Sequence, residues 1–254
     1  MEQSISKKGN RIHWIDNARG VSLVSMILYH FMFDLVYIFG VNIGWYRNWQ
    51  GYYWQQSICI TFILLSGISC AFGRNNVKRG AITFAFGMLM TLGTWVAMPS
   101  QLIKFGILHF LGLVRIVFGL LEKPLKKIKP EIGFAVFLLL FLVTKTVPEG
   151  FIGIGDRRLL ELPDILYSSK LLFPLGFPHA SFWSGDYFPM IPWSFLFLAG
   201  FYFWGILAKF GKKGAGFKPW PVFNFLGRHS LFIYVIHQPI CYGILLLLDY
   251  FKVL

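Results

Sequence analysis

Apolar residues run in long blocks along this chain, and short clusters of charged residues separate the blocks. A helix needs about 20 apolar residues to cross a bilayer. Seven blocks approach or reach that length, which predicts an all-α, polytopic transmembrane helix bundle of about seven spans. The predicted spans cover about 15–39, 56–72, 81–98, 104–121, 132–147, 189–208 and 227–250.

The connections between the blocks indicate a single domain over 1–254, with one long loop at about 148–187. Within that loop, the apolar stretch 159–175 is a candidate for a partial interfacial segment. The first block follows a short basic tail and is too long for the apolar core of a signal peptide. We therefore interpret it as a retained first span.

Basic residues divide unequally between the two sides of this predicted topology. Lys and Arg accumulate in loops on the cytoplasmic side of membrane proteins. The richer set is Lys7, Lys8, Arg11, Arg19, Arg74, Lys78, Arg79, Lys123, Lys126, Lys127, Lys129, Lys209, Lys212, Lys213, Lys218 and Arg228. The poorer set is Arg47, Lys104, Lys145, Arg157, Arg158, Lys170 and Lys252. The imbalance predicts a cytoplasmic N-terminus and an outer C-terminus.

Composition agrees with a membrane protein, because 56% of the residues are hydrophobic and only 14% are charged. Soluble domains are closer to half apolar and a quarter charged. The net charge of +13 could suggest a nucleic-acid partner. Its placement between apolar blocks excludes that reading and leaves the lipid bilayer as the partner. Cys59, Cys70 and Cys241 lie within apolar blocks and lack disulfide or zinc spacing, which predicts buried thiols.

The first block carries four ionisable residues: Asp16, Arg19, His30 and Asp34. A helix turns 100° and rises 1.5 Å per residue, so His30 lies about 20° round from Arg19 and roughly 16 Å further along. Asp34 and Asp16 each lie one turn beyond these two, so all four share one stripe. Ionisable residues at membrane depth face a bundle interior or a cavity and are candidates for function.

The stripe suggests a catalytic arrangement. Arg19, at the cytoplasmic rim, is placed to meet a phosphate. Neutral His30 would be a general base, and Asp34 would accept its other ring N–H and fix the tautomer. The alternative is structural: an interfacial Arg, a His bonded to another helix and an Asp at the outer rim.

Two further histidines lie at comparable mid-to-outer depth, His109 in the fourth span and His237 in the seventh. Either all three imidazoles converge on one cavity, or each makes an ordinary interhelical hydrogen bond. The spacing carries no metal signature, so we expect no metal. Arg115 lies deep in the fourth span and should pair with a carboxylate such as Asp16 or with a ligand phosphate.

Other charged and aromatic residues are candidates for ligand binding. Arg79 belongs to the cytoplasmic basic set and could clamp a phosphate, although topology alone explains such residues. Outside, the aromatic stretch 173–193 contains Asp186 and Trp193, which could bind hydroxyls and stack on a sugar ring. An aromatic belt at the interface is the alternative.

The stretch "RGVSLVSMILYH" in the first block resembles the motif of the membrane acyltransferase-3 group. More closely, the chain resembles bacterial members of the heparan-alpha-glucosaminide N-acetyltransferase catalytic-domain family. The similar stretches are "RIHWIDNARG", "YHFMFDL", "FILLSGIS", "FGILHFLG", "DYFPMIPW" and "LGRHSLFIYVIHQP". The resemblance implies transfer of an acetyl group from cytosolic acetyl-CoA to a sugar or glycan across the membrane, without a metal.

The sequence departs from this family at one place. The animal lysosomal branch has its active-site His just before a Trp-Asn-Gly in the loop after the first helix, and an Asn where this chain has His30. The similar place here reads "WYRNWQG", with Tyr46 at the position of that His. Either the catalytic His lies within the first helix in this chain, or the chemistry differs.

We interpret the chain as an acyl-CoA-dependent O- or N-acetyltransferase of a bacterial cytoplasmic membrane. The expected catalytic residues are His30, Asp34 and His109. Arg19, Asp16, Arg79 and Arg115 are expected to bind the donor, and Asp186, His237 and Trp193 the acceptor. Two alternatives stay open: a transporter or channel that uses the Arg19/His30/Asp34 stripe as an ion path, and a non-catalytic subunit of an envelope-assembly complex.

Overall fold

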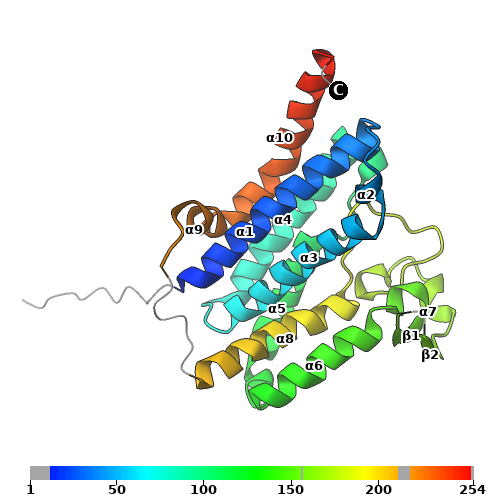
Figure 1. Ribbon diagram of the computed structural model, residues 1–254. Coiled ribbons are helices and arrows are strands. Elements are labelled where there is room, and N and C mark those ends of the chain that lie inside the picture. The colour runs from blue at the N-terminus through cyan, green and yellow to red at the C-terminus, as the bar shows by residue number, and fades with distance from the viewer. Residues whose placement is uncertain (1–11, 156, 211–217, 253–254) are drawn as a thin grey trace, which may run out of the picture. The chain divides into compact units, whose positions relative to one another are not determined.

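The computed structural model describes residues 12–155, 157–210 and 218–252. Within these residues the chain is predominantly helical, which confirms the all-α membrane fold (Figure 1). Each predicted span coincides with a long helix. These helices are α1 (His13–Phe33), α3 (Trp49–Cys70), α4 (Asn76–Ala97), α5 (Ile107–Leu125), α6 (Pro130–Thr144), α8 (Met190–Lys209) and α10 (Ser230–Tyr250).

Five helical segments are long and apolar enough to cross a membrane in the part of the chain that the structure describes. They are His13–Ile38, Asn76–Ala97, Pro130–Glu149, Met190–Lys209 and Ser230–Tyr250. Helices α3 and α5 fall outside this group because α3 begins with Trp, Tyr and Gln, and α5 contains Arg115, Glu122 and Lys123. A total of seven spans, and the orientation of the termini, stay predictions.

The long loop at about 148–187 contains structure that the hydrophobic pattern did not predict. Strands β1 (Phe151–Ile154) and β2 (Arg157–Glu161) form an antiparallel pair, and the short helix α7 (Ile165–Ser168) follows. The stretch 159–175 is therefore not one membrane-dipping helix, because it is divided among β2, α7 and a 3₁₀ turn at Phe173–Leu175. Two prolines in this stretch, Pro163 and Pro174, account for the interruptions.

The chain divides into two compact units, which are described separately. The first unit comprises Met1–Cys59 and Phe210–Leu254, and the second comprises Ile60–Lys209. The single domain over 1–254 stays a prediction. Cys59, Cys70 and Cys241 are buried and form no disulfide with one another.

In the first unit, α1 contacts α10 and the short helix α9 (Pro221–Arg228) (Figure 1). The backbones of α1 and α9 approach closely at two glycines. A Cβ on Gly20 would lie 1.9 Å from the carbonyl oxygen of Phe223, and one on Gly227 would lie 1.9 Å from that of Asp16. Only glycine permits contact at this distance, so these residues fix α9 against the start of α1.

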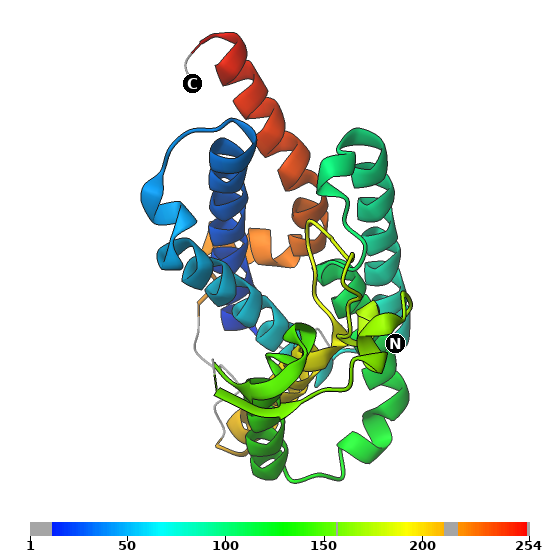
Figure 2. The same cartoon turned by 90° about the vertical axis from the view of Figure 1, so that its right-hand side faces the viewer.

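In the second unit, α4 contacts α5, and α8 contacts both α5 and α6. Strand β1 contacts α6, so the hairpin of β1 and β2 lies beside that helix (Figure 2). A Cβ on Gly112 of α5 would lie 2.5 Å from the backbone nitrogen of Phe84 on α4. Small residues at such positions let two helices approach closely. In a membrane the lipid is as apolar as the helices, so the helices associate through these dispersion contacts and not through the hydrophobic effect.

Candidate active site

Helix α1 carries the predicted stripe, and the first turns of this helix hold an ion pair that the sequence did not predict. The guanidinium Nη1 of Arg19 lies 3.3 Å from Oδ1 of Asp16. The side chain of Arg19 is 21% exposed, against 11% for that of Asp16. Arg19 thus remains accessible to a ligand while the carboxylate beside it lowers the cost of holding a cation there.

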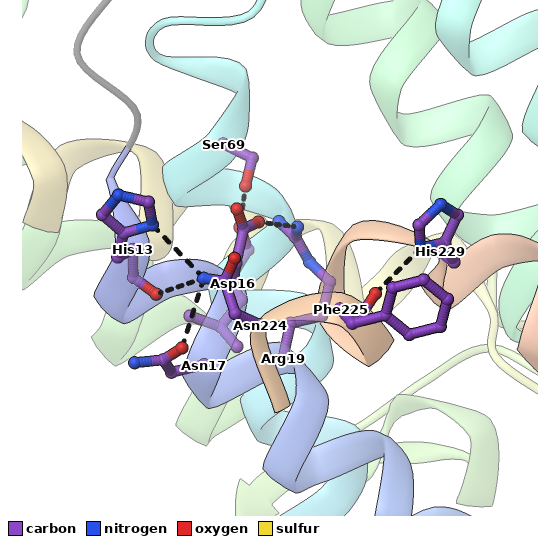
Figure 3. A network of polar contacts seen from close by, with 9 residues as sticks. His13, Asp16, Asn17, Arg19, Ser69, Asn224, Phe225 and His229 are labelled. Atoms are coloured by element: carbon purple, nitrogen blue, oxygen red, sulfur yellow. Dashed lines mark hydrogen bonds and ion pairs between the residues drawn. The ribbon is translucent and has the colours of Figure 1, made fainter. Parts of the chain in front are cut away.

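The start of α1 is fixed by an amide network that the sequence did not reveal (Figure 3). The side-chain Nδ2 of Asn224 on α9 donates to Oδ1 of Asn17 at 3.2 Å and approaches both Nδ1 and the carbonyl of His13 at 3.4 Å. Oδ1 of Asn17 also accepts the backbone N–H of Trp220 at 3.1 Å. Asn17 and Asn224 are buried. The network positions the turn that carries Asp16 and Arg19.

Further along α1, the ring of His30 meets that of His237 on α10. Their centroids are 4.9 Å apart. The sequence placed these two imidazoles at comparable depth, and the structure brings them into contact. His237 is only 4% exposed, so its polar atoms are effectively removed from water.

Asp34 pairs with α10, and not with His30. Its Oδ1 accepts a hydrogen bond from Nε2 of Gln238 at 2.7 Å. The expectation that Asp34 orients the ring of His30 is therefore wrong in this structure. The physical reason is local: Asp34 is fully buried and opens a π-helical turn, Asp34–Ile38, where Gln238 supplies the donor. Such turns widen a helix and recur at functional sites.

His30, Asp34, His237 and Gln238 form what we call the polar cluster. Three buried atoms in it have no hydrogen-bond partner among the described residues: Oδ2 of Asp34, Nε2 of His237 and Oε1 of Gln238. Buried polar groups in proteins are nearly always paired, so unpaired ones in one cluster indicate a binding or catalytic role. All three atoms are acceptors in the arrangement described, so a hydroxyl, an amine or water would satisfy them.

Aromatic residues cover one side of this cluster. The ring of Tyr29 lies 5.8 Å from that of His30 and 5.2 Å from that of Tyr46. The hydroxyl of Tyr46 donates to the carbonyl of Tyr29 at 2.9 Å. Burial raises the pKa of Tyr46, which keeps its phenol neutral. Tyr46 thus braces α1 next to His30.

The contacts of His109 favour a structural role over the predicted catalytic one. The backbone N–H of Gly106 donates to Nδ1 at 3.3 Å, so the ring proton lies on Nε2, which meets Oγ1 of Thr91 at 3.2 Å. Both ring nitrogens are occupied, and the residue is buried. No lone pair is left to accept a proton from a substrate.

Asp186 and Trp193, predicted to bind the acceptor, both lie in the second unit. Oδ2 of Asp186 accepts the backbone N–H of Ile107 at 2.9 Å, at the start of α5. A carboxylate at this end of a helix is favourable, but burial raises the pKa of Asp186 to about 6. Trp193 is buried against Phe188, with centroids 5.1 Å apart.

Arg115 and Arg79 also lie in the second unit. Nε of Arg115 donates to Sγ of Cys70 at 3.1 Å, so the expected carboxylate partner is replaced by a thiol. Asp16, the carboxylate suggested for it, pairs with Arg19. Arg79 is exposed. A thiol is a weak acceptor, so the remaining donors of Arg115 stay suited to a ligand phosphate.

Comparison with protein families shows to which family the chain belongs. The family described as heparan-alpha-glucosaminide N-acetyltransferase, catalytic, matches residues 11–239. The chain belongs to this family. No curated protein and no solved structure matches the chain. The family match runs from the start of α1 to Pro239 in α10, so the whole polar cluster lies inside the catalytic domain.

Membership of this N-acetyltransferase family, together with the apolar helices, makes the chain a multi-pass membrane protein of an acetyltransferase family. Among the described residues, no group of three His, Cys, Asp or Glu is placed to hold a metal ion. Sequence analysis did not single out Gln238, Asn17 or Asn224. The only signal for Gln238 was its place in "VIHQP", beside His237.

Proposed function

We propose that this chain transfers an acetyl group from cytosolic acetyl-CoA to a sugar or glycan acceptor on the far side of a bacterial cytoplasmic membrane. One observation carries the proposal: a buried cluster with three unpartnered acceptor atoms lies within the matched catalytic domain. The stripe along α1 connects His30 and Asp34 of this cluster to Arg19, which is accessible.

The donor would bind at the cytoplasmic end of α1. CoA carries several phosphate groups, and a guanidinium binds phosphate through paired hydrogen bonds. Arg19 is accessible enough to do so. His30 lies eleven residues further along α1, roughly 16 Å at 1.5 Å per residue. The extended pantetheine arm is long enough to bring the thioester from one position to the other.

The acceptor would bind at the polar cluster. Its hydroxyl or amine donates to the unpartnered acceptor atoms, and one imidazole of the His30–His237 pair takes its proton. The acceptor oxygen or nitrogen then forms a bond to the acetyl carbonyl carbon, and the bond from that carbon to sulfur breaks. Sulfur leaves with the electron pair and receives the proton from the imidazole, giving free CoA. Acid–base help of this kind contributes about 10²–10⁴-fold in rate.

For the second unit, taken by itself, ligand binding stays a prediction: Arg79 and Arg115 for a phosphate, and Asp186 and Trp193 for an acceptor. Asp186 also caps α5. His109 fixes the start of α5 through its contact with Gly106 and takes no part in proton transfer.

The first test is binding of acetyl-CoA to the purified protein in detergent, measured by calorimetry. We expect saturable binding that Arg19→Ala weakens about tenfold or more, because a phosphate contact is lost. His30→Ala should bind the donor nearly as well as wild type. Arg157→Ala is the matched control, because Arg157 is an exposed cation of strand β2. Absence of binding to wild type would refute the proposal, as would equal losses in Arg19→Ala and Arg157→Ala.

A further inference from the structure

The two imidazoles of the polar cluster are not equivalent. Nδ1 of His237 lies 2.5 Å from the backbone carbonyl of Tyr234. A carbonyl can only accept, so Nδ1 carries the ring proton and Nε2 carries the lone pair. That Nε2 is buried and has no partner among the described residues. It is a prepared proton acceptor.

His30 lacks this preparation. In the part of the chain that the structure describes, its ring contacts are with Tyr29 and His237, and no hydrogen bond fixes its tautomer. By exposed surface, His30 is half-buried, whereas His237 is buried. His30 is therefore placed to position the ring of His237, which it contacts on one side.

We infer that His237, on α10, is the imidazole that takes the proton of the acceptor, and that His30 is a positioning residue beside it. The inference rests on the proposed function and assigns a role within the same site. The acceptor O–H or N–H bond breaks as Nε2 of His237 binds the proton. The proton then passes to the sulfur of CoA as the thioester bond breaks, so His237 ends in its starting state.

The test measures thiol release from acetyl-CoA with glucosamine as acceptor, for wild type, His237→Gln and His30→Gln. We expect His237→Gln to lower kcat by about 10²–10⁴-fold with unchanged donor binding, because general-base help is lost. His30→Gln should lower kcat by a smaller factor. His229→Gln is the matched control. Nδ1 of His229 also meets a backbone carbonyl, that of Phe225 at 2.9 Å, but the residue is exposed (Figure 3).

The outcomes distinguish failure of the proposed function from failure of the role assigned to His237. Wild type that neither binds acetyl-CoA nor releases thiol refutes the proposed function. Active wild type with an equally active His237→Gln refutes only the present inference, as does a larger loss in His30→Gln than in His237→Gln.

A second measurement does not depend on the folding of His237→Gln. In the His229→Gln protein, labelled with ¹⁵N in its imidazole rings, the ring of His237 should be neutral and carry its proton on Nδ1. Absence of such a ring from the spectrum would overturn the inference.

Discussion

Replacing Gln238 by leucine tests the contact that holds Asp34 in the polar cluster. The substitution keeps the side chain similar in size and removes the donor that lies 2.7 Å from Oδ1 of Asp34. Asp34 is fully buried, so water cannot replace the lost donor. Hydrogen bonds to charged groups contribute about 1.5–3 kcal/mol to stability. We therefore expect Gln238→Leu to destabilise the protein by about 2 kcal/mol.

The assay is thermal unfolding in detergent, followed by tryptophan fluorescence. For a chain of this size, 1 kcal/mol shifts Tm by about 2–4 °C, so a loss of about 2 kcal/mol in Gln238→Leu should lower Tm by roughly 4–8 °C. Asp34→Asn and the double variant complete the cycle. Coupling of about 1 kcal/mol or more between the two positions is expected, because the contact exists only when both groups are present. An unchanged Tm in Gln238→Leu, or additive effects in the double variant, would refute the reasoning.

Two further predictions concern other parts of the fold. Gly20→Ala should lower Tm clearly, because the added Cβ would lie 1.9 Å from the carbonyl oxygen of Phe223 and must displace α9. Gly243→Ala is the control: a Cβ there would have nothing within 4 Å, so Tm should stay unchanged or rise slightly. Equal shifts of Tm in both variants would contradict the close contact at Gly20. Burial raises the pKa of Asp186 to about 6 from 3.8, so the folded state binds more protons than the unfolded state between these values, and stability should fall as pH rises from about 4 to 6. Asp186→Asn keeps an oxygen for the N–H of Ile107 and should flatten this pH dependence of Tm; an unchanged slope would show that Asp186 does not titrate in that window.

The hydrophobic pattern predicted the positions of the seven long helices found in the described residues, because the backbone of such apolar blocks can satisfy its hydrogen bonds in a membrane only as helices. It missed the separation of α9 from α10 at His229, because both segments are apolar and the break depends on how α9 docks on α1. It also missed β1 and β2, whose pairing joins residues on either side of a turn. Such pairing depends on the turn as much as on the strands.

For the site, helix periodicity was enough to place Arg19, His30 and Asp34 on one stripe. It could not identify Gln238 as the partner of Asp34, because that contact joins two helices far apart in the chain. The expected pairing of Arg115 with a carboxylate was wrong for the same reason: its partner, the thiol of Cys70, lies on another helix. Tautomers are also set by such contacts, as the rings of His109 and His237 show.

All three native cysteines are buried, which has a practical consequence for labelling. A membrane-impermeant maleimide added to intact cells should leave the native thiols unreacted. A single introduced cysteine, such as Ser181→Cys in an exposed part of the long loop, would then report its own side of the membrane. The wild-type chain can therefore serve directly as the background for topology mapping, without prior removal of its thiols.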